Sequence, residues 1–300
     1  MSLFSTLRTT AVLLLAPLLA SSAQVHPEWT ATIAPFRIAD NLYYVGSRDL
    51  ASYLITTPAG NILINANLES SPPQIKASVE RLGYRWTDTK LLLLAQAHFD
   101  HAAGAAQIRK ETGAKLEVME GDANVVSSGG KDDFLAASGS LPTYPPAKVD
   151  EVLHDGAIIT LGGFTLTAHR TAGHTRGCTT WTMKVHMQQD LPDRYRDVVI
   201  VGGYTLWSDF QVVPTKTHPV SYPGIAEDFR HTFALLANLH CDIFLGDHAS
   251  HFGMLEKLAR LSKEGESVWI DPVGYQRTVE NARVAFEKFY ATQENSSAVR

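Results

Sequence analysis

A continuous apolar run, Leu91–Ala95, stops abruptly at a segment rich in metal-ligand side chains. Strands buried on both faces read as unbroken apolar runs of this length, so the run predicts a central strand in a sheet that is covered on both sides. His98, Asp100 and His101 follow closely. Binding sites in α/β sheets form where strands end and side chains converge. The run therefore predicts an α/β fold and a candidate metal site at the end of one strand.

The composition is that of an ordinary globular protein. Of 300 residues, 45% are hydrophobic and 19% are charged, and 26 basic against 31 acidic residues leave a formal net charge of −5. This mildly acidic balance gives no support for nucleic-acid binding. Two cysteines cannot build a disulfide framework. We expect Cys178 and Cys241 to be buried thiols, although the sequence leaves their pairing open.

The first 23 residues have the features of a secretory signal peptide. Arg8 supplies a positive start, residues 11–20 form an apolar run too short to span a bilayer, and Ser21–Ala23 are small. We therefore expect cleavage before Gln24, export to the periplasm, and a mature chain of residues 24–300. The alternative is a short uncleaved anchor, which the small residues disfavour. No later apolar run is long enough to cross a membrane.

Strands occur in both halves of the chain, with helices between them. The expected strands are residues 41–47, 52–57, 62–65, 91–95, 116–120, 157–161, 164–169, 178–185, 197–201 and 242–245. The expected helices are residues 73–82, 105–112, 227–239 and 275–290. From 121 to 149 the pattern weakens, which indicates a long surface excursion. No linker divides the chain, so we expect one domain over 24–300, with sheet packed on sheet and helices outside.

Two further histidines follow other predicted strands. His174 comes after one strand, with Gly173 allowing a sharp turn before it, and His248 comes after another. Alone, either would more often be a surface histidine. With the ligand-type side chains that follow residue 95, they complete two three-ligand sets of the kind that suits zinc. The sequence therefore favours two metal ions held side by side.

These motifs resemble those of the metallo-β-lactamase superfamily. The matching segments are Gln96–His101, Ala172–Thr175 and His248, and the resemblance covers nearly the whole mature chain. Within the superfamily, the chain is most similar to the third subclass of zinc β-lactamases, in its glutamine-bearing branch. The resemblance implies an α/β fold of four layers, the αββα sandwich, with the metal ions at its edge.

The resemblance also implies roles for the candidate residues. His98 and His174 match ligands of a first zinc, and Asp100, His101 and His248 match ligands of a second. The implied activity is hydrolysis of the β-lactam amide of penicillins, cephalosporins and carbapenems by a metal-bound hydroxide, and hence antibiotic resistance. Asp100 would be catalytic, because it would orient the attacking water or relay its proton.

Gln96 is the main departure from the family pattern. It stands where most relatives have a third histidine for the first zinc. A neutral amide oxygen is a weaker zinc ligand than an imidazole nitrogen. We therefore expect one or two zinc ions per chain, with the site of Asp100, His101 and His248 favoured over the first.

Two other interpretations stay open beside the β-lactamase. Tyr204 stands where thioesterases, lactonases and nucleases of the superfamily usually have a metal-bridging aspartate, which disfavours a hydrolase of thioesters, lactones or phosphoesters. A non-catalytic zinc-binding periplasmic protein is the third interpretation, because the loss of a ligand is one route to the loss of activity. The expected partner is a small β-lactam, with a monomeric chain and no nucleic acid or membrane.

Some remaining features carry less weight. His251 is an alternative metal ligand close to the last candidate. Ser128 and Lys131 fit the Ser-x-x-Lys pattern of serine β-lactamases, but no Ser-Asp-Asn or Lys-Thr-Gly accompanies them. Residues 121–149 and 204–210 are expected to flank the site. We expect Trp207 and Phe210 to lie in the core rather than against a substrate.

Overall fold

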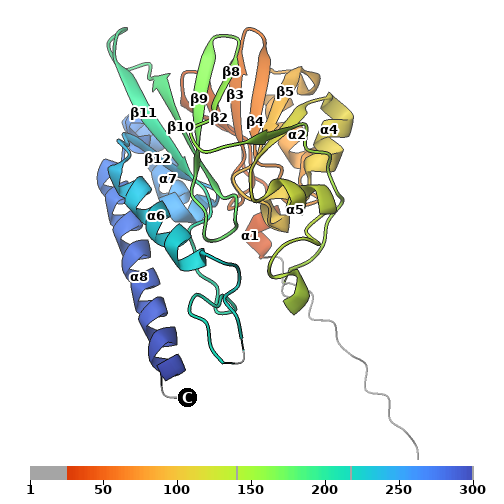
Figure 1. Ribbon diagram of the computed structural model, residues 1–300. Helices are drawn as coiled ribbons and strands as arrows, with labels where there is room; N and C mark the ends of the chain where they lie inside the picture. Colours follow the sequence, from red (N-terminus) through yellow and green to blue (C-terminus); the bar gives the residue numbers. More distant parts are fainter. Residues whose placement is uncertain (1–25, 140, 217, 299–300) are drawn as a thin grey trace, which may run out of the picture.

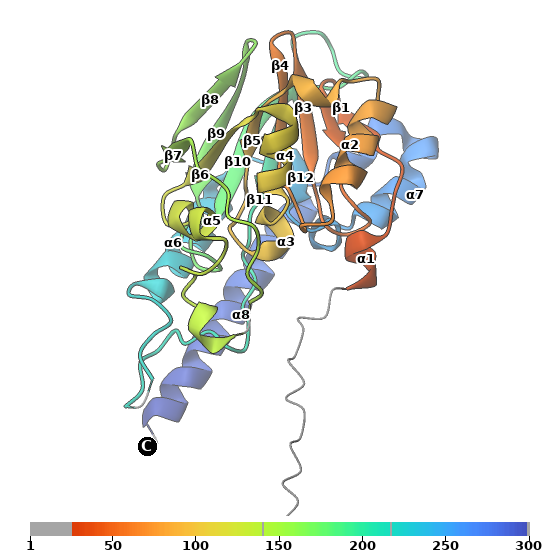
Figure 2. The same ribbon diagram turned by 90° about the vertical axis from the view of Figure 1, so that its right-hand side faces the viewer.

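Two β-sheets pack face to face, and helices cover the outer face of each (Figures 1 and 2). The computed structural model describes residues 26–139, 141–216 and 218–298. The predicted signal peptide and its cleavage site before Gln24 lie outside these residues. Within the described ranges, no helix combines the length and the apolar character that crossing a membrane requires.

The first sheet has seven strands in the order β1-β2-β3-β4-β5-β6-β7. Strands β1 to β4 pair antiparallel, whereas β4 to β7 run parallel. The strands are β1 Phe36–Ala39, β2 Leu42–Tyr44, β3 Tyr53–Thr57, β4 Gly60–Ile64, β5 Thr89–Leu93, β6 Lys115–Met119 and β7 Glu151–Leu153. The helices that pack on its outer face are α2 Pro72–Arg81, α4 Ala105–Thr112 and α5 Ala123–Ser128.

The second sheet has five strands in the order β12-β11-β10-β9-β8. Its strands pair antiparallel except β12, which runs parallel to β11. The strands are β8 Ile158–Leu161, β9 Phe164–Arg170, β10 Thr179–His186, β11 Tyr195–Val201 and β12 Ile243–Gly246. Its outer helices are α6 Ile225–Asn238, α7 Met254–Glu264 and α8 Pro272–Ala298 (Figure 1). The predicted four-layer αββα sandwich is confirmed.

The apolar run that follows residue 90 forms β5 and the residues just after it. Leu91 and Leu93 face the other sheet, whereas Leu92 and Leu94 pack against the outer helices. Successive side chains of a strand point to opposite faces, so a strand covered on both faces needs an apolar residue at every position. The unbroken apolar run therefore indicates a strand in the middle of the sandwich, covered on both faces.

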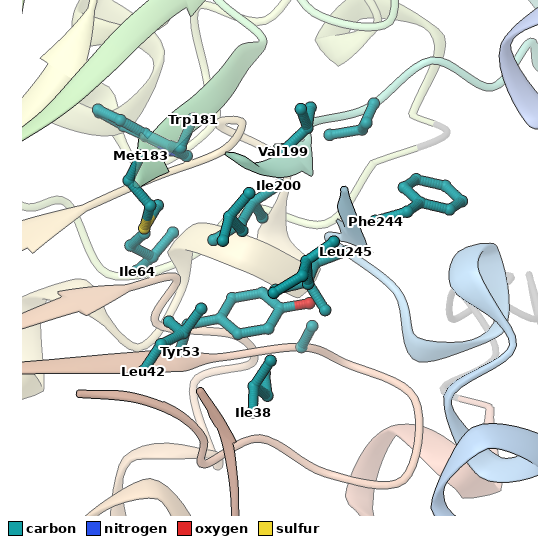
Figure 3. Packing of buried hydrophobic residues seen from close by; sticks show 14 of the residues in the cluster. Ile38, Leu42, Tyr53, Ile64, Trp181, Met183, Val199, Ile200, Phe244 and Leu245 are labelled. Atoms are coloured by element: carbon teal, nitrogen blue, oxygen red, sulfur yellow. The ribbon is translucent and has the colours of Figure 1, made fainter. Parts of the chain in front are cut away.

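Side chains from both sheets interlock in the central core (Figure 3). Tyr53 and Ile64 come from the first sheet and meet Trp181, Met183 and Ile200 from the second. All five are at most 5% exposed. Cys178 and Cys241 are also buried, and both are free, as expected from the sequence.

Several regular elements were not predicted, among them two helices and two strands of the sandwich. The weak stretch from 121 to 149 contains α5, whose Val125 and Val126 pack on the first sheet. Helix α7 was also missed, although Leu258 and Leu261 lie one helical turn apart and pack against the core. Strands β1 and β7 were also missed, and both are short strands at the edges of the first sheet.

The position of Ile200 between the sheets gives a stability test. Ile200→Ala should lower the free energy of unfolding by about 2–5 kcal/mol, because it removes a fully buried side chain and leaves a cavity. The matched control Ile158→Ala, at a side chain that is 70% exposed, should change it by less than about 0.5 kcal/mol. Urea unfolding of the two variants measures both values, and equal losses would contradict this core.

Candidate metal centre

The candidate ligands gather at one end of the sandwich because each follows the end of a strand. His98 comes after β5 and begins the short helix α3 (Phe99–Ala102), which carries Asp100 and His101. His174 follows β9, and His248 follows β12. Strands of both sheets thus deliver ligands to the same place.

An asparagine turn after β4 fixes the ligand loop. Asn65 and Asn67 have φ of 68° and 55°, a left-handed backbone that asparagine tolerates better than most residues. The backbone N–H groups of Ala66 and Asn67 both donate to the carbonyl oxygen of His101, and the Asn65 side chain accepts from the backbone N–H of Ala95. The turn therefore holds the start and the end of the ligand segment together.

Asp100, His101 and His248 form one of two ligand groups. We call it the second-metal group, because these residues match the ligands of the second zinc ion. His101 Nε2 lies 3.2 Å from His248 Nε2 and 3.4 Å from Asp100 Oδ2, and His248 Nε2 lies 3.5 Å from Asp100 Oδ2. A tetrahedral zinc ion with bonds of about 2.0–2.1 Å requires ligand atoms about 3.3 Å apart. The three ligand atoms therefore fit one zinc ion without rearrangement.

Gln96, His98 and His174 form the first-metal group. His98 Nδ1 lies 3.1 Å from His174 Nε2, which is again the spacing of two ligands on one ion. Gln96 is 3% exposed, and among the described residues its Oε1 atom has no hydrogen-bond partner. A buried carbonyl oxygen of this kind needs a donor or a cation, so the group fits a metal ion.

Gly203 allows the loop after β11 to approach the first-metal group. A Cβ atom at this position would lie 2.6 Å from Cδ2 of His174 and 2.9 Å from Nε2 of Gln96. Real Cβ atoms do not come so close to other heavy atoms, so a larger residue here would displace one of these side chains. The same contacts place the side chains of Gln96 and His174 side by side.

Burial and neighbouring charges set the protonation of these groups. Burial, with His98 nearby, lowers the pKa of His174 to about 3, so its ring is neutral at pH 7 and has a lone pair for a metal. Burial opposes ionisation of Asp100, but His101 and His248 outweigh it and hold the pKa of that carboxyl well below its usual range. Burial likewise lowers the pKa of His248, but its hydrogen bonds to Asp100 and Asp49 prevail and raise it to about 10. His248 must therefore lose a proton when a metal binds.

Most of the ligand side chains have a partner on the side away from the group. His174 Nδ1 donates to the backbone oxygen of Thr205 at 2.8 Å, and this leaves Nε2 as the lone-pair nitrogen. His248 Nδ1 lies 2.9 Å from Asp49 Oδ2, and His98 Nε2 lies 3.5 Å from Asp133 Oδ2. Such outer partners orient metal ligands and raise their basicity.

Sequence reasoning missed these outer partners. Asp49 and Asp133 are far from the ligands along the chain, and neither stands in a recognisable motif. Asp247, which accepts a hydrogen bond from Gln96 Nε2 at 2.8 Å, directly precedes His248, so its position was the one available signal. Among the described residues, the buried Nδ1 of His101 and the buried Nε2 of His98 have no hydrogen-bond partner, although Asp133 lies within ion-pair distance of His98.

A buried carboxylate supports the turn that carries His174. Asp122 accepts hydrogen bonds from Thr175 Oγ1 at 2.7 Å and from the Gly177 N–H at 2.8 Å. Burial raises the pKa of Asp122 to about 6, and these two hydrogen bonds oppose that rise. Gly173 has a φ of 140°, so the sharp turn expected before His174 is present.

Comparison with known proteins agrees with this geometry. A family model described as the metallo-β-lactamase superfamily matches residues 48–185. The structure of the FEZ-1 metallo-β-lactamase from Legionella gormanii is 46% identical in sequence, covers 88% of this chain and 98% of its own, and superposes with a TM-score of 0.83. The chain belongs to the metallo-β-lactamase superfamily.

Other solved members of the superfamily give the same result. LRA-12, a class B3 di-zinc metallo-β-lactamase from an Alaskan soil metagenome, is 37% identical with a TM-score of 0.80 and coverage of 89% and 98%. BJP-1, a subclass B3 enzyme of Bradyrhizobium japonicum, is 34% identical with a TM-score of 0.80 and coverage of 90% and 98%. A curated probable metallo-hydrolase of Burkholderia pseudomallei is 28% identical over 139 residues, which is 46% of this chain and 44% of that protein.

Aromatic residues flank the metal-ligand groups of this superfamily member. The Trp207 ring stacks on His98 at 4.9 Å and meets His174 edge-on at 5.1 Å, so it covers the first-metal group and is only partly in the core as predicted. Phe210, 1% exposed, is in the core as predicted. A pocket of about 540 Å³ opens beside His248, and Trp29 is in its lining.

Two weaker sequence candidates do not join the metal-ligand groups in this superfamily member. His251 Nδ1 lies 3.0 Å from Asp247 Oδ1 rather than with the ligands of the second-metal group. Ser128 Oγ donates to the backbone oxygen of Val125 at 3.1 Å, at the end of α5. Neither arrangement provides a ligand or a nucleophile.

A second acidic cluster offers a poorer site. Asp197, His240 and Asp242 lie close enough to surround one ion, but all three are exposed or half-buried. Asp197 Oδ1 already accepts from Lys184 Nζ at 2.6 Å, so its charge is compensated. We assign no metal to it.

The contact between Asp49 and His248 predicts a selective effect on metal binding. Asp49→Asn should weaken the zinc affinity of the second-metal group about 10–100-fold, the range for loss of an outer partner. Asp40→Asn, at an exposed carboxylate, is the control and should leave affinity unchanged. Chelator-competition titration measures both values. Equal affinities for the two variants would show that Asp49 does not support His248.

Proposed function

We propose that this chain is a zinc β-lactamase that hydrolyses the amide bond of penicillins, cephalosporins and carbapenems. The observation that carries the proposal is the spacing of Asp100, His101 and His248, which fits one zinc ion with ligand atoms 3.2–3.5 Å apart. The similarity over nearly the full length of FEZ-1 and LRA-12, which are described as metallo-β-lactamases, supports the substrate class.

Zinc bound to these groups would lower the pKa of a coordinated water toward neutrality and polarise the substrate carbonyl. The chain supplies the rest of the chemistry. Asp100 supplies the carboxylate that would orient the attacking water or accept its proton. The same carboxyl would return that proton to the ring nitrogen when the C–N bond breaks.

The thiol beside the first-metal group is not suited to act as a covalent nucleophile. Cys178, the nearest thiol, is fully buried, and burial raises its pKa well above the usual value. Water is therefore the attacking group in this proposal. The Trp207 ring, which covers His98 and His174, would exclude bulk solvent from the first-metal group.

We assign the tighter zinc to the second-metal group. Asp100, His101 and His248 supply one carboxylate and two imidazoles, whereas the first-metal group has two imidazoles and the weaker amide of Gln96. One zinc in the second-metal group would suffice for the reaction.

The proposal includes the setting of the enzyme. We propose that residues 1–23 are a cleaved signal peptide and that residues 24–300 act as a monomeric, single-domain enzyme in the periplasm, where they would confer β-lactam resistance. Its partner would be the antibiotic, and the net charge of −5 agrees with the absence of a nucleic-acid partner.

Hydrolysis assays test the reaction. The purified mature chain with zinc should open nitrocefin and imipenem, and Asp100→Asn should lower kcat/KM at least about 100-fold, the scale for loss of a proton-transfer group. Asp132→Asn, at an exposed carboxylate of the excursion, is the matched control and should retain activity. Turnover of lactones, thioesters or phosphoesters far above that of β-lactams would overturn the substrate class. Zinc binding without any turnover would identify a binding protein instead.

A zinc titration tests the assignment of the tighter site. Activity should appear in proportion to the first equivalent of zinc added to the metal-free chain, because that ion enters the second-metal group. Activity that appears only with the second equivalent would show that the Gln96 site is required. Stopped-flow hydrolysis of nitrocefin at each step gives the measurement.

A further inference from the structure

Gln96 and Asp247 form a buried polar pair beside the metal-ligand groups. Gln96 is 3% exposed and Asp247 is 0% exposed. Gln96 Nε2 donates to Asp247 Oδ2 at 2.8 Å, and the other carboxylate oxygen, Oδ1, lies 3.0 Å from His251 Nδ1. The backbone N–H of Asp247 donates to the backbone oxygen of Val201. The carboxylate is therefore held in place independently of Gln96.

The hydrogen bond from Gln96 to Asp247 fixes the orientation of the Gln96 amide group. An ionised carboxylate only accepts hydrogen bonds, whereas an amide has a donor end and an acceptor end. Turning the amide over would set its oxygen against the carboxylate oxygen in a buried environment, which is unfavourable. Gln96 Oε1 is thus directed away from Asp247, and it has no hydrogen-bond partner within the described ranges.

The Gln96 side chain lies beside the first-metal group. The side chains of Gln96 and His174 lie against the same backbone position, Gly203. His174 Nε2 in turn lies 3.1 Å from His98 Nδ1. A buried, unpartnered amide oxygen on a side chain that lies beside two metal-ligand histidines is the chemistry expected of a third ligand.

We propose that Asp247 is a positioning residue that makes Gln96 a ligand of the first metal ion. It holds the NH2 end of the amide and so presents the oxygen to the ion. Its negative charge also shifts electron density onto that oxygen, in the way outer carboxylates raise the basicity of metal-bound histidines. The inference rests on the function proposed for this site, and it explains how a chain without a third histidine keeps a usable first-metal group.

The direct test is metal affinity in the full mature chain. Asp247→Asn keeps the shape but offers either a donor or an acceptor, so the Gln96 amide is no longer forced into one orientation. We expect zinc affinity of the first-metal group to fall about 10–100-fold. Chelator-competition titration and the visible spectrum of the Co²⁺-substituted chain measure this without any assay of hydrolysis. An affinity within twofold of the unchanged chain would overturn the inference.

A double-variant cycle separates positioning from a general effect of charge or packing. In Gln96→Ala the ligand is absent, so adding Asp247→Asn should cause no further loss of first-metal affinity. An additional loss in the double variant would mean that Asp247 acts otherwise than through Gln96. Asp49→Asn serves as a selectivity control, because it should weaken the second-metal group and spare the first.

Two measurements keep the outcome interpretable. Circular dichroism melting checks that each variant folds, and Asp247→Ser, which also leaves the amide orientation open, replaces Asp247→Asn if that variant does not fold. A chain that binds two zinc ions but opens no β-lactam would refute the proposed function and leave this inference standing. A chain that binds only one ion, with unchanged affinity in Gln96→Ala, would refute the inference alone.

Discussion

The arrangement depends on burying charged and polar side chains at the junction of two sheets. Asp100 and His101 are at most 6% exposed, and His98 and His174 are at most 4% exposed. A buried polar atom without a partner costs roughly 1–3 kcal/mol. Thr205, Asp49 and Asp247 therefore satisfy the outer polar atoms of His174, His248 and Gln96, and they select which atom of each side chain faces the metal.

Direct hydrogen bonds between the sheets keep this junction closed. The Thr179 N–H donates to the Ala95 oxygen at 2.7 Å, and the Tyr53 hydroxyl donates to the Gly246 oxygen at 2.6 Å. Both contacts join the end of a ligand-bearing strand to the opposite sheet. The ligands thus sit on elements that cannot move apart without breaking backbone contacts, which is the preorganisation that metal sites need.

The features that could be predicted from the sequence are those set by neighbouring residues. Contacts between segments far apart in the chain could not be predicted. The alternation of Leu91 to Leu94 between two apolar clusters made the central strand readable, and the ligand run directly after it could be recognised without a fold. The contacts of Asp133 and Trp207 with the His98 ring could not be recognised in this way. They require residues 121–149 and the loop after β11 to come together at His98. Helix α7 is a different case, because its leucines recur at helical spacing and its absence from the prediction was not forced by the sequence.

Each candidate group takes ligands from both sheets, and this has a consequence for the unfolded chain. His101 and His248 are 147 positions apart, so one ion bound by both would close a very long loop. A cross-link of that span limits the freedom of the unfolded ensemble more than a short one does, and for disulfides the calculated gain is about 4–5 kcal/mol. Because both cysteines are free, the metal ion would provide a cross-link between distant segments that no disulfide provides.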